Sequence, residues 1–168
     1  MVKMDIKRIF RHLFMRHAQV RRAFSPATLE AIAQSIQTSE FRHEGEILFV
    51  VEPALEGAGL YRGQTPRERA IEVFSQQRVW DTAGNSGLLI YLLMADRAVE
   101  IVVDRGLHLK VPAYEWERIC QAMQTAFTQS DYLTGVVEGI EEVSQHLVVH
   151  FPAKEQRFNE LPDHPVIL

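Results

Sequence analysis

Oxygen-bearing side chains gather around two apolar segments in the middle of the chain. Asp81, Asn85 and Ser86 precede the apolar run from residue 87 to 95. Asp104 ends the next apolar run. Carboxylate, amide and hydroxyl oxygens are hard ligands that suit Ca²⁺ or Mg²⁺ better than zinc. Their spacing matches no recognised metal motif, and carboxylates near strand ends are also common as solvated loop residues or helix caps, so both interpretations stay open.

Two arginines lie close to these segments. Arg97 follows Asp96 in the short connection between the apolar runs, where it could hold an anionic ligand. The same two residues also suit an exposed turn, with Glu100 within pairing reach. Arg105 follows Asp104 directly and could stabilise the charge of a phosphoryl group beside a bound metal.

A complete catalytic set is missing. The chain has no serine in a nucleophile elbow, no phosphate-binding glycine loop and no zinc-finger spacing. The only cysteine, Cys120, lies in a predicted helix, where a small buried hydrophobe is expected. His146 and His150 stand one helical turn apart, but no third metal ligand accompanies them. No residue therefore presents itself as a nucleophile or general base.

The elements that position these residues follow from hydrophobic periodicity and from capping signals. We expect helices over 5–18, 25–39 and 65–79, strands over 46–52, 86–95 and 98–104, and two closing helices after Pro112 and from Asp131. The helix between the first two strands makes them parallel, and a two-residue connection makes the last two an antiparallel hairpin. The predicted fold class is α/β, with helices covering both faces of a small mixed sheet.

This topology predicts two candidate sites. The loop that enters the second strand and the loop that leaves the third share one end of the sheet, which gathers Asp81, Asn85, Ser86, Asp104 and Arg105. The opposite end receives Glu52, Asp96 and Arg97.

Charge and hydrophobic periodicity divide the chain into three segments. Residues 1–24 carry a balance of +6 against a total of −4, and are predicted to form a basic amphipathic helix. Residues 25–151 form the α/β domain, and 152–168 are expected to be an irregular tail. The acidic remainder of the chain would repel phosphates, so nucleic-acid binding is not expected. No apolar run is long enough to span a bilayer.

The apolar side of this N-terminal helix needs a cover. It consists of Ile6, Ile9, Phe10, Leu13 and Phe14. Three covers are open: the domain's own core, an anionic membrane surface attracted by the basic residues, or a protein partner that could be a second copy of the chain. The sequence does not determine the oligomeric state.

The segment Trp80 to Gly106, WDTAGNSGLLIYLLMADRAVEIVVDRG, resembles the central signature of the TPM domain family. The likeness extends more weakly from about Ser25 to His150. It implies a three-layer α/β/α sandwich. Some members, including thylakoid-lumen proteins tied to photosystem repair, are described as weak acid phosphatases that bind divalent cations, and the resemblance implies that class of activity.

Two departures from the family pattern concern the cation. The Asp-Asn-Gly loop of the family is Asn85-Ser86-Gly87 here, so one formal charge is missing. The glycine-aromatic-glycine loop of the family is Asp104-Arg105-Gly106 here. Many members carry a signal peptide and a membrane anchor, whereas this chain resembles the short, unanchored cytosolic type.

Two functions are compatible with these observations. The favoured one is a non-catalytic binding or assembly and maintenance module, cation-binding and membrane-associated. The alternative is a weak divalent-cation-dependent acid phosphatase, in which Asp81, Asn85 and Asp104 hold Ca²⁺ or Mg²⁺ and Arg105 stabilises the phosphoryl charge. The candidate ligand-binding residues are Ser86 and Arg105 at this end of the sheet and Arg97 at the other. Enzyme activity stays undecided at this point.

Overall fold

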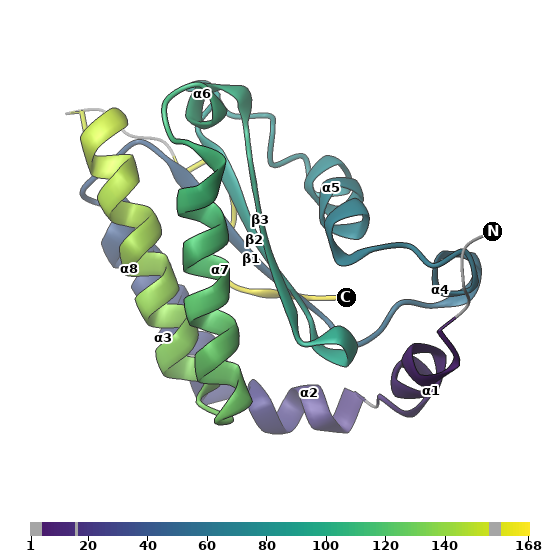
Figure 1. Ribbon diagram of the computed structural model, residues 1–168. Helices are drawn as coiled ribbons and strands as arrows, with labels where there is room; N and C mark the ends of the chain where they lie inside the picture. The colour runs from purple at the N-terminus through teal and green to yellow at the C-terminus, as the bar shows by residue number, and fades with distance from the viewer. Residues whose placement is uncertain (1–4, 16, 155–158) are drawn as a thin grey trace.

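The computed structural model describes residues 5–15, 17–154 and 159–168 and has a mixed α/β fold (Figure 1). Four strands form one sheet in the order β3-β2-β1-β4. They are β1 (Glu46–Glu52), β2 (Gly87–Leu93), β3 (Ala98–Val103) and β4 (Val166–Ile167). β1 is parallel to both β2 and β4, whereas β2 and β3 are antiparallel. The predicted parallel crossover and hairpin are confirmed.

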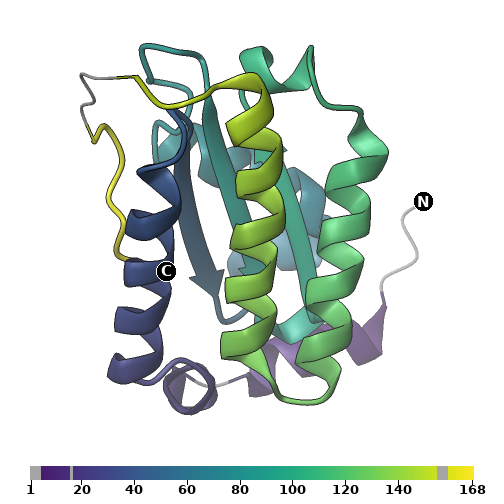
Figure 2. The same cartoon turned by 90° about the vertical axis from the view of Figure 1, so that its left-hand side faces the viewer.

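Helices cover both faces of this sheet. On one face α3 (Pro26–Glu40), α7 (Ala113–Thr128) and α8 (Tyr132–His150) pack side by side, as Figure 2 shows. On the other face α5 (Pro66–Gln76) packs against β2 and β3. The short helix α4 (Gly57–Tyr61) lies between β1 and α5 in the chain. The expected three-layer α/β/α sandwich is therefore confirmed.

The continuous apolar sequences of β1 and β2 follow from their position at the centre of the sheet. Every residue of β1 and of β2 is buried. Alternate side chains point to opposite faces of a strand. Ile47, Phe49 and Ile90 accordingly join the core under α3, α7 and α8, while Leu48 and Leu89 join the core under α5.

α3 and α5 begin at the capping residues that the sequence predicts. The Ser25 side chain accepts a hydrogen bond from the Thr28 amide at the start of α3. Thr65 and Glu68 form a reciprocal capping box at the start of α5. Proline occupies the first turn of both helices, where its missing amide hydrogen costs nothing.

The single helix expected over residues 5–18 is instead two helices. α1 (Ile6–Phe14) ends at Met15, whose backbone is extended, and α2 (His17–Ala23) begins two residues later. Arg16, which was expected inside the helix, lies outside the described residues. The break has a packing reason, because Val20 of α2 is buried in the domain core while His12 of α1 is buried at a different place, beside Asp96.

The tail expected to be irregular contributes β4 to the sheet. The Leu168 amide donates a hydrogen bond to the Val51 carbonyl. Upstream, the Glu160 and Leu161 amides donate to the buried Glu46 carboxylate at the start of β1. The described part of the tail therefore closes the outer side of β1, and a two-residue strand is too short for periodicity to reveal it.

Two further features lie outside what the sequence predicted. The hairpin between β2 and β3 contains a 3₁₀ turn, η1 (Met94–Asp96), followed by Arg97 in the left-handed conformation with φ 52°. A short helix, α6 (Arg105–His108), follows β3 directly. In the part of the chain that the structure describes, no helix is long and apolar enough to cross a membrane.

The start of β2 tolerates no side chain at Gly87. A Cβ atom there would lie 1.9 Å from the backbone oxygen of Val79, so the chain itself would have to move. Gly87→Ala should lower the free energy of unfolding by about 1–3 kcal/mol, as overpacking does in other cores. Urea denaturation measures the change.

The control is Gly59→Ala in α4, where the added methyl group would meet only the end of the flexible Gln64 side chain. A Gly87→Ala protein as stable as the Gly59→Ala protein would contradict this account.

Candidate functional site

The first predicted site forms where β2 begins and β3 ends, which we call the Asp104 end of the sheet (Figure 1). The Asp104 amide donates to the Gly87 carbonyl over 2.9 Å, and the Gly106 amide donates to the Asn85 carbonyl over 3.1 Å. These bonds join the loop before β2 to the start of α6. The structure thus brings the loop of Asn85 against Asp104, as the strand order predicts.

Most polar groups at the Asp104 end are held by other groups of the protein. Asp81 forms an ion pair with Arg78 at 2.5 Å and is half exposed. The Asn85 side-chain oxygen accepts a hydrogen bond from Arg105 Nε over 3.1 Å. Ser86 is buried, and its hydroxyl donates to the Glu44 carbonyl.

Asp104 is the exception. Its Oδ1 accepts from the Arg105 amide over 2.7 Å and so caps α6. Its Oδ2 is buried and has no hydrogen-bond partner among the residues that the structure describes. A buried carboxylate oxygen without a protein partner is unusual. Two observations argue against a bound cation. The Arg105 guanidinium already binds the side-chain oxygen of the neighbouring Asn85. Within the described ranges, no group of three His, Cys, Asp or Glu side chains could hold a metal ion.

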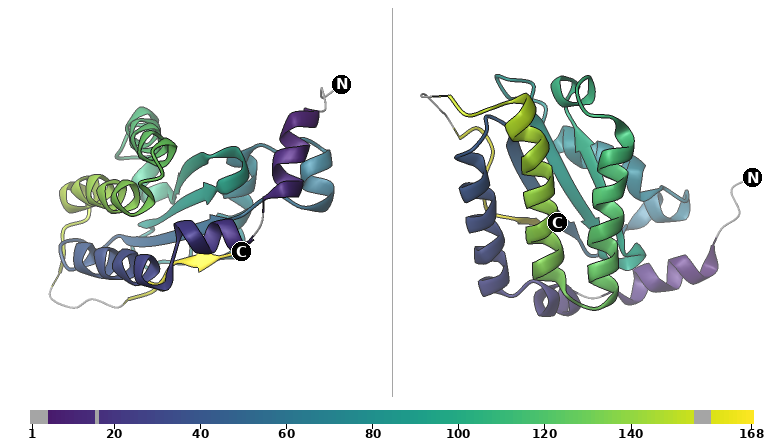
Figure 3. Two further views of the ribbon diagram at one scale, coloured as in Figure 1. Left: turned by 90° about the horizontal axis from the view of Figure 1, so that it is seen from below. Right: turned by 60° about the vertical axis from the view of Figure 1, so that its left-hand side comes forward.

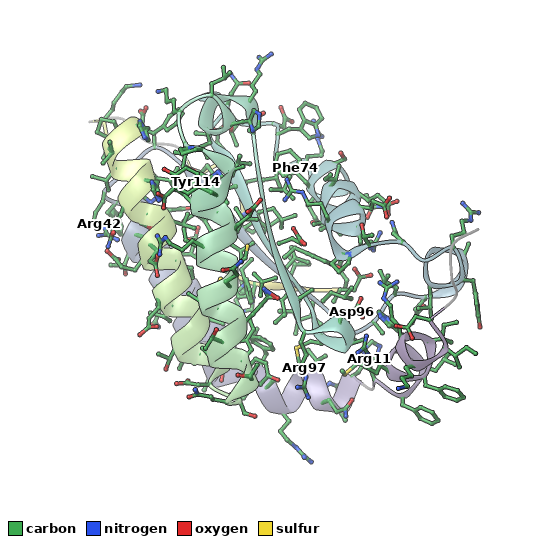
Figure 4. All side chains as sticks on the ribbon, in the orientation of Figure 1. Arg11, Arg42, Phe74, Asp96, Arg97 and Tyr114 are labelled. Carbon is green, nitrogen blue, oxygen red and sulfur yellow. The ribbon has the colours of Figure 1, made fainter. Side chains whose placement is uncertain are left out.

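The second predicted site lies where β1 and β2 end, which we call the Asp96 end. Asp96 accepts hydrogen bonds from Arg8 Nε at 2.9 Å and from Arg8 Nη2 at 2.7 Å. Arg11 Nη2 approaches to 3.3 Å, and His12 Nε2 lies 3.0 Å from the other carboxylate oxygen. Figure 4 shows Arg11 reaching from α1 toward Asp96. One carboxylate in η1 therefore holds three basic side chains of α1.

His12 completes this attachment. Its side chain is fully buried, and Nδ1 accepts a hydrogen bond from the Leu55 amide over 2.9 Å. Because a backbone amide can only donate, Nδ1 carries no proton, and the ring proton lies on Nε2, which faces Asp96. Arg8 also donates to the Gln64 carbonyl over 2.7 Å. α1 is thus fixed to the domain through its polar side.

The charge of Asp96 is stabilised by these contacts. Burial alone would raise the pKa of the Asp96 carboxyl, but the contacts with Arg8 and His12 lower this pKa below its usual value of 3.8. The Asp96 carboxylate is therefore ionised in the folded protein at neutral pH.

The apolar side of α1 is left outside. Ile6, Phe10, Leu13 and Phe14 are 60%, 54%, 60% and 66% exposed. Phe10 and Phe14 stack on each other with their ring centroids 6.0 Å apart. Of the five apolar residues in the predicted stripe, only Ile9 packs partly against the core. Packing onto the domain's own core, the commonest use of such a stripe, is not what the structure shows.

Arg97 stands next to this attachment with an exposed side chain. It forms no ion pair or side-chain hydrogen bond within the ranges 5–15, 17–154 and 159–168. Its guanidinium is therefore available to an anionic ligand, and its role in binding one stays a prediction.

A cavity of about 1390 Å³ opens at the Asp96 end between α1, α4, α5 and the end of β1. Its wall includes Glu52 and Arg69, which bind each other through Arg69 Nε at 2.9 Å. The Tyr91 hydroxyl donates to the same Glu52 carboxylate over 2.6 Å. Burial raises the pKa of Tyr91 far above its usual value. These charges neutralise one another, so the network stabilises the wall rather than offering a free reactive group.

Sequence reasoning placed Glu52 at this end but missed Arg69, Tyr91 and the whole attachment of α1. Arg69 follows the capping box of α5 and resembles any exposed helical arginine in the sequence. Only the packing of α5 over the end of β1 shows that its guanidinium reaches Glu52.

The family model of the TPM domain matches residues 19–146, which is most of the chain. The chain belongs to the TPM domain family. This match covers β1, β2, β3 and the Asp104 end, whereas α1 lies before it. A comparison with curated protein sequences finds no match.

Solved structures agree with this assignment. The BA42 protein of the psychrophilic bacterium Bizionia argentinensis is 28% identical, with a TM-score of 0.74, over 86% of this chain and 94% of that one. The N-terminal domain of a P. gingivalis protein is 23% identical, with a TM-score of 0.61, over 78% and 82%. The N-terminal domain of a Corynebacterium glutamicum protein is 15% identical, with a TM-score of 0.54, over 80% and 79%. The last two support the fold alone.

The attachment of α1 predicts a specific acid sensitivity. Asp96→Asn removes the charge that Arg8 and His12 surround, and should lower the free energy of unfolding at neutral pH by about 1–3 kcal/mol. Because the folded-state pKa of Asp96 is lowered, its contribution is present above pH 3.8 and is lost as the pH falls through the folded-state value. The stability gap between the wild type and Asp96→Asn should therefore shrink below that pH in urea titrations.

The matched control is Asp81→Asn, which removes a half-exposed ion pair and should cost at most about 1 kcal/mol. A gap for Asp96→Asn that stays constant down to about pH 2.5 would show that the carboxylate charge is not the stabilising element.

Proposed function

We propose that this TPM domain is a non-catalytic binding or assembly and maintenance module rather than a hydrolase. The observation that supports the proposal is that the predicted metal-binding and ligand-binding groups are engaged by other groups of the protein. Arg78 holds Asp81, Arg105 holds Asn85, and the Glu44 carbonyl holds the Ser86 hydroxyl. A phosphatase site would need some of these groups free to meet a metal and a phosphoryl group.

The nucleophiles of the chain support the same conclusion. The Ser86 hydroxyl is buried and donates to the Glu44 backbone carbonyl, which cannot act as a base and take its proton. Burial raises the pKa of the Cys120 thiol to about 12, so this thiol stays protonated at neutral pH. Both nitrogens of His12 face groups of the protein.

Cation binding is the finer part of the proposal. The buried Oδ2 of Asp104 is the acceptor that a Ca²⁺ or Mg²⁺ ion would use, together with Asn85 and, after a change of partner, Asp81. A cation would have to displace the Arg105 guanidinium from Asn85. We therefore propose weak cation binding in support of structure, with a weak phosphatase as the alternative that the same residues would serve.

The proposed place of action is the cytoplasm, at the periphery of a membrane. Support comes from the exposed apolar side chains of α1 and from the basic charge around them. Arg97 is the side chain proposed to meet an anionic ligand there.

Phosphatase assays test the non-catalytic proposal. With a phosphate monoester and excess Ca²⁺ or Mg²⁺, the full chain should show no turnover above that of Asp104→Ala, because neither the Ser86 hydroxyl nor the Cys120 thiol is activated. The control for folding is the urea stability of both proteins. Robust hydrolysis by the wild type that Asp104→Ala abolishes, with the fold retained, would establish the phosphatase alternative instead.

Restoring the family's charge should strengthen the cation site. Asn85→Asp adds a carboxylate beside Asp104 and gives Arg105 a charged partner that a divalent ion can replace. Calorimetric titration should show Ca²⁺ affinity rising by roughly tenfold, since charge count tunes such sites.

Asn85→Ser is the matched control, because it changes the same position without adding charge. Equal Ca²⁺ affinity in both variants and the wild type would place any cation elsewhere.

A further inference from the structure

The N-terminal helix presents its sides in an unusual way. In most amphipathic helices of globular proteins the apolar side faces the core and the charged side faces water. In α1 the order is reversed, since Arg8 and His12 are turned inward to Asp96 while Phe10 and Phe14 are exposed. Figure 3 shows α1 at the margin of the molecule beside α4, away from the layer of α3, α7 and α8.

The attachment to Asp96 also holds α1 as a helix before any ligand binds. A helix of nine residues is too short to be stable alone in water. Its cap at Asp5 and its bonds to Asp96, Gln64 and Leu55 hold it in place. The exposed apolar residues are thus displayed on a rigid support and need no further folding before they bind.

Exposed basic side chains lie on the same helix as this apolar surface, on the next helix and in the hairpin that holds Asp96. Lys7 lies on α1, Arg21 and Arg22 lie on α2, and Arg97 lies beside the attachment to Asp96. All four are exposed, and none has an acidic partner in the part of the chain that the structure describes. Arg11 adds a side chain that is 58% exposed. The surface therefore combines aromatic and aliphatic groups with uncompensated positive charge.

We infer that α1 docks this domain on an anionic lipid bilayer, with Ile6, Phe10, Leu13 and Phe14 entering the headgroup region and Lys7 meeting acidic lipid. The inference deepens the membrane-associated part of the proposed function and rests on it. Basic side chains near such a surface each contribute about fivefold in affinity, and buried phenyl groups roughly tenfold or more. The acidic remainder of the domain is repelled, which orients the molecule with α1 toward the lipid.

The charge argues against a second copy as the occupant. Two copies that paired through the same side of α1 would bring like charges together on both helices. The apolar surface also consists of four side chains from one short helix, whereas a stable protein interface buries about 800 Å² on each partner. A bilayer requires neither complementary charge on a protein nor so large a shaped surface.

Vesicle co-sedimentation of the full chain tests the inference. The probes are phosphatidylcholine vesicles with and without about one third phosphatidylserine, at low and at high salt. Binding should require phosphatidylserine and weaken with salt. Phe10→Gln with Phe14→Gln should lower the partition coefficient about 100-fold, and Lys7→Gln about fivefold.

Phe41→Gln is the matched control, because Phe41 is 73% exposed and lies at the end of α3 rather than on α1. It should bind as the wild type does. Urea denaturation checks that each variant remains folded, as expected for exposed positions.

Three results would overturn the inference. The wild type could stay in the supernatant with anionic vesicles, or the double phenylalanine variant could bind as tightly as Phe41→Gln. The third is a wild type that is a dimer by light scattering and becomes a monomer in the double variant, since a second copy would then cover α1. None of these results depends on Asp104, so they are distinguishable from a failure of the non-catalytic proposal in the phosphatase assay.

Discussion

Burial of β1 and β2 on both faces is the constraint on which the rest of this structure depends. All seven positions of β1 and all seven of β2 are buried, so helices must cover the sheet from both sides. Polar groups are then confined to the two ends of the strands and to the helix surfaces. The polar clusters at the Asp104 end and at the Asp96 end both arise from that one requirement.

The sequence predicted those elements whose signals are local. Ser25 with Pro26, and Thr65 with Glu68, predicted the starts of α3 and α5, and the short connection after β2 predicted the hairpin. The convergence of Asn85 and Asp104 followed from strand order. What could not be predicted depends on contacts between distant residues, such as Arg8 with Asp96, 88 positions apart.

The same difference between local signals and long-range contacts explains why the single helix predicted at the N-terminus is two helices, α1 and α2. Periodicity from Ile6 to Phe14 indicates a helix with an apolar side, and nothing local says which side will be buried. The outcome was decided by a buried carboxylate in η1 and an amide at Leu55, which together bind the polar side of α1. Patterns of hydrophobicity therefore identify an amphipathic helix, while its orientation depends on partners elsewhere in the chain.

The closure of β1 by the C-terminal segment has a kinetic consequence. Glu46 accepts hydrogen bonds from amides 114 and 115 positions further along the chain, and β4 pairs with Val50 and Val51 from a similar distance. Contacts of such long range form slowly and late. A ribosome that has released β1, β2 and β3 has not yet supplied the segment that completes the outer side of β1, so this strand waits with an open edge during synthesis.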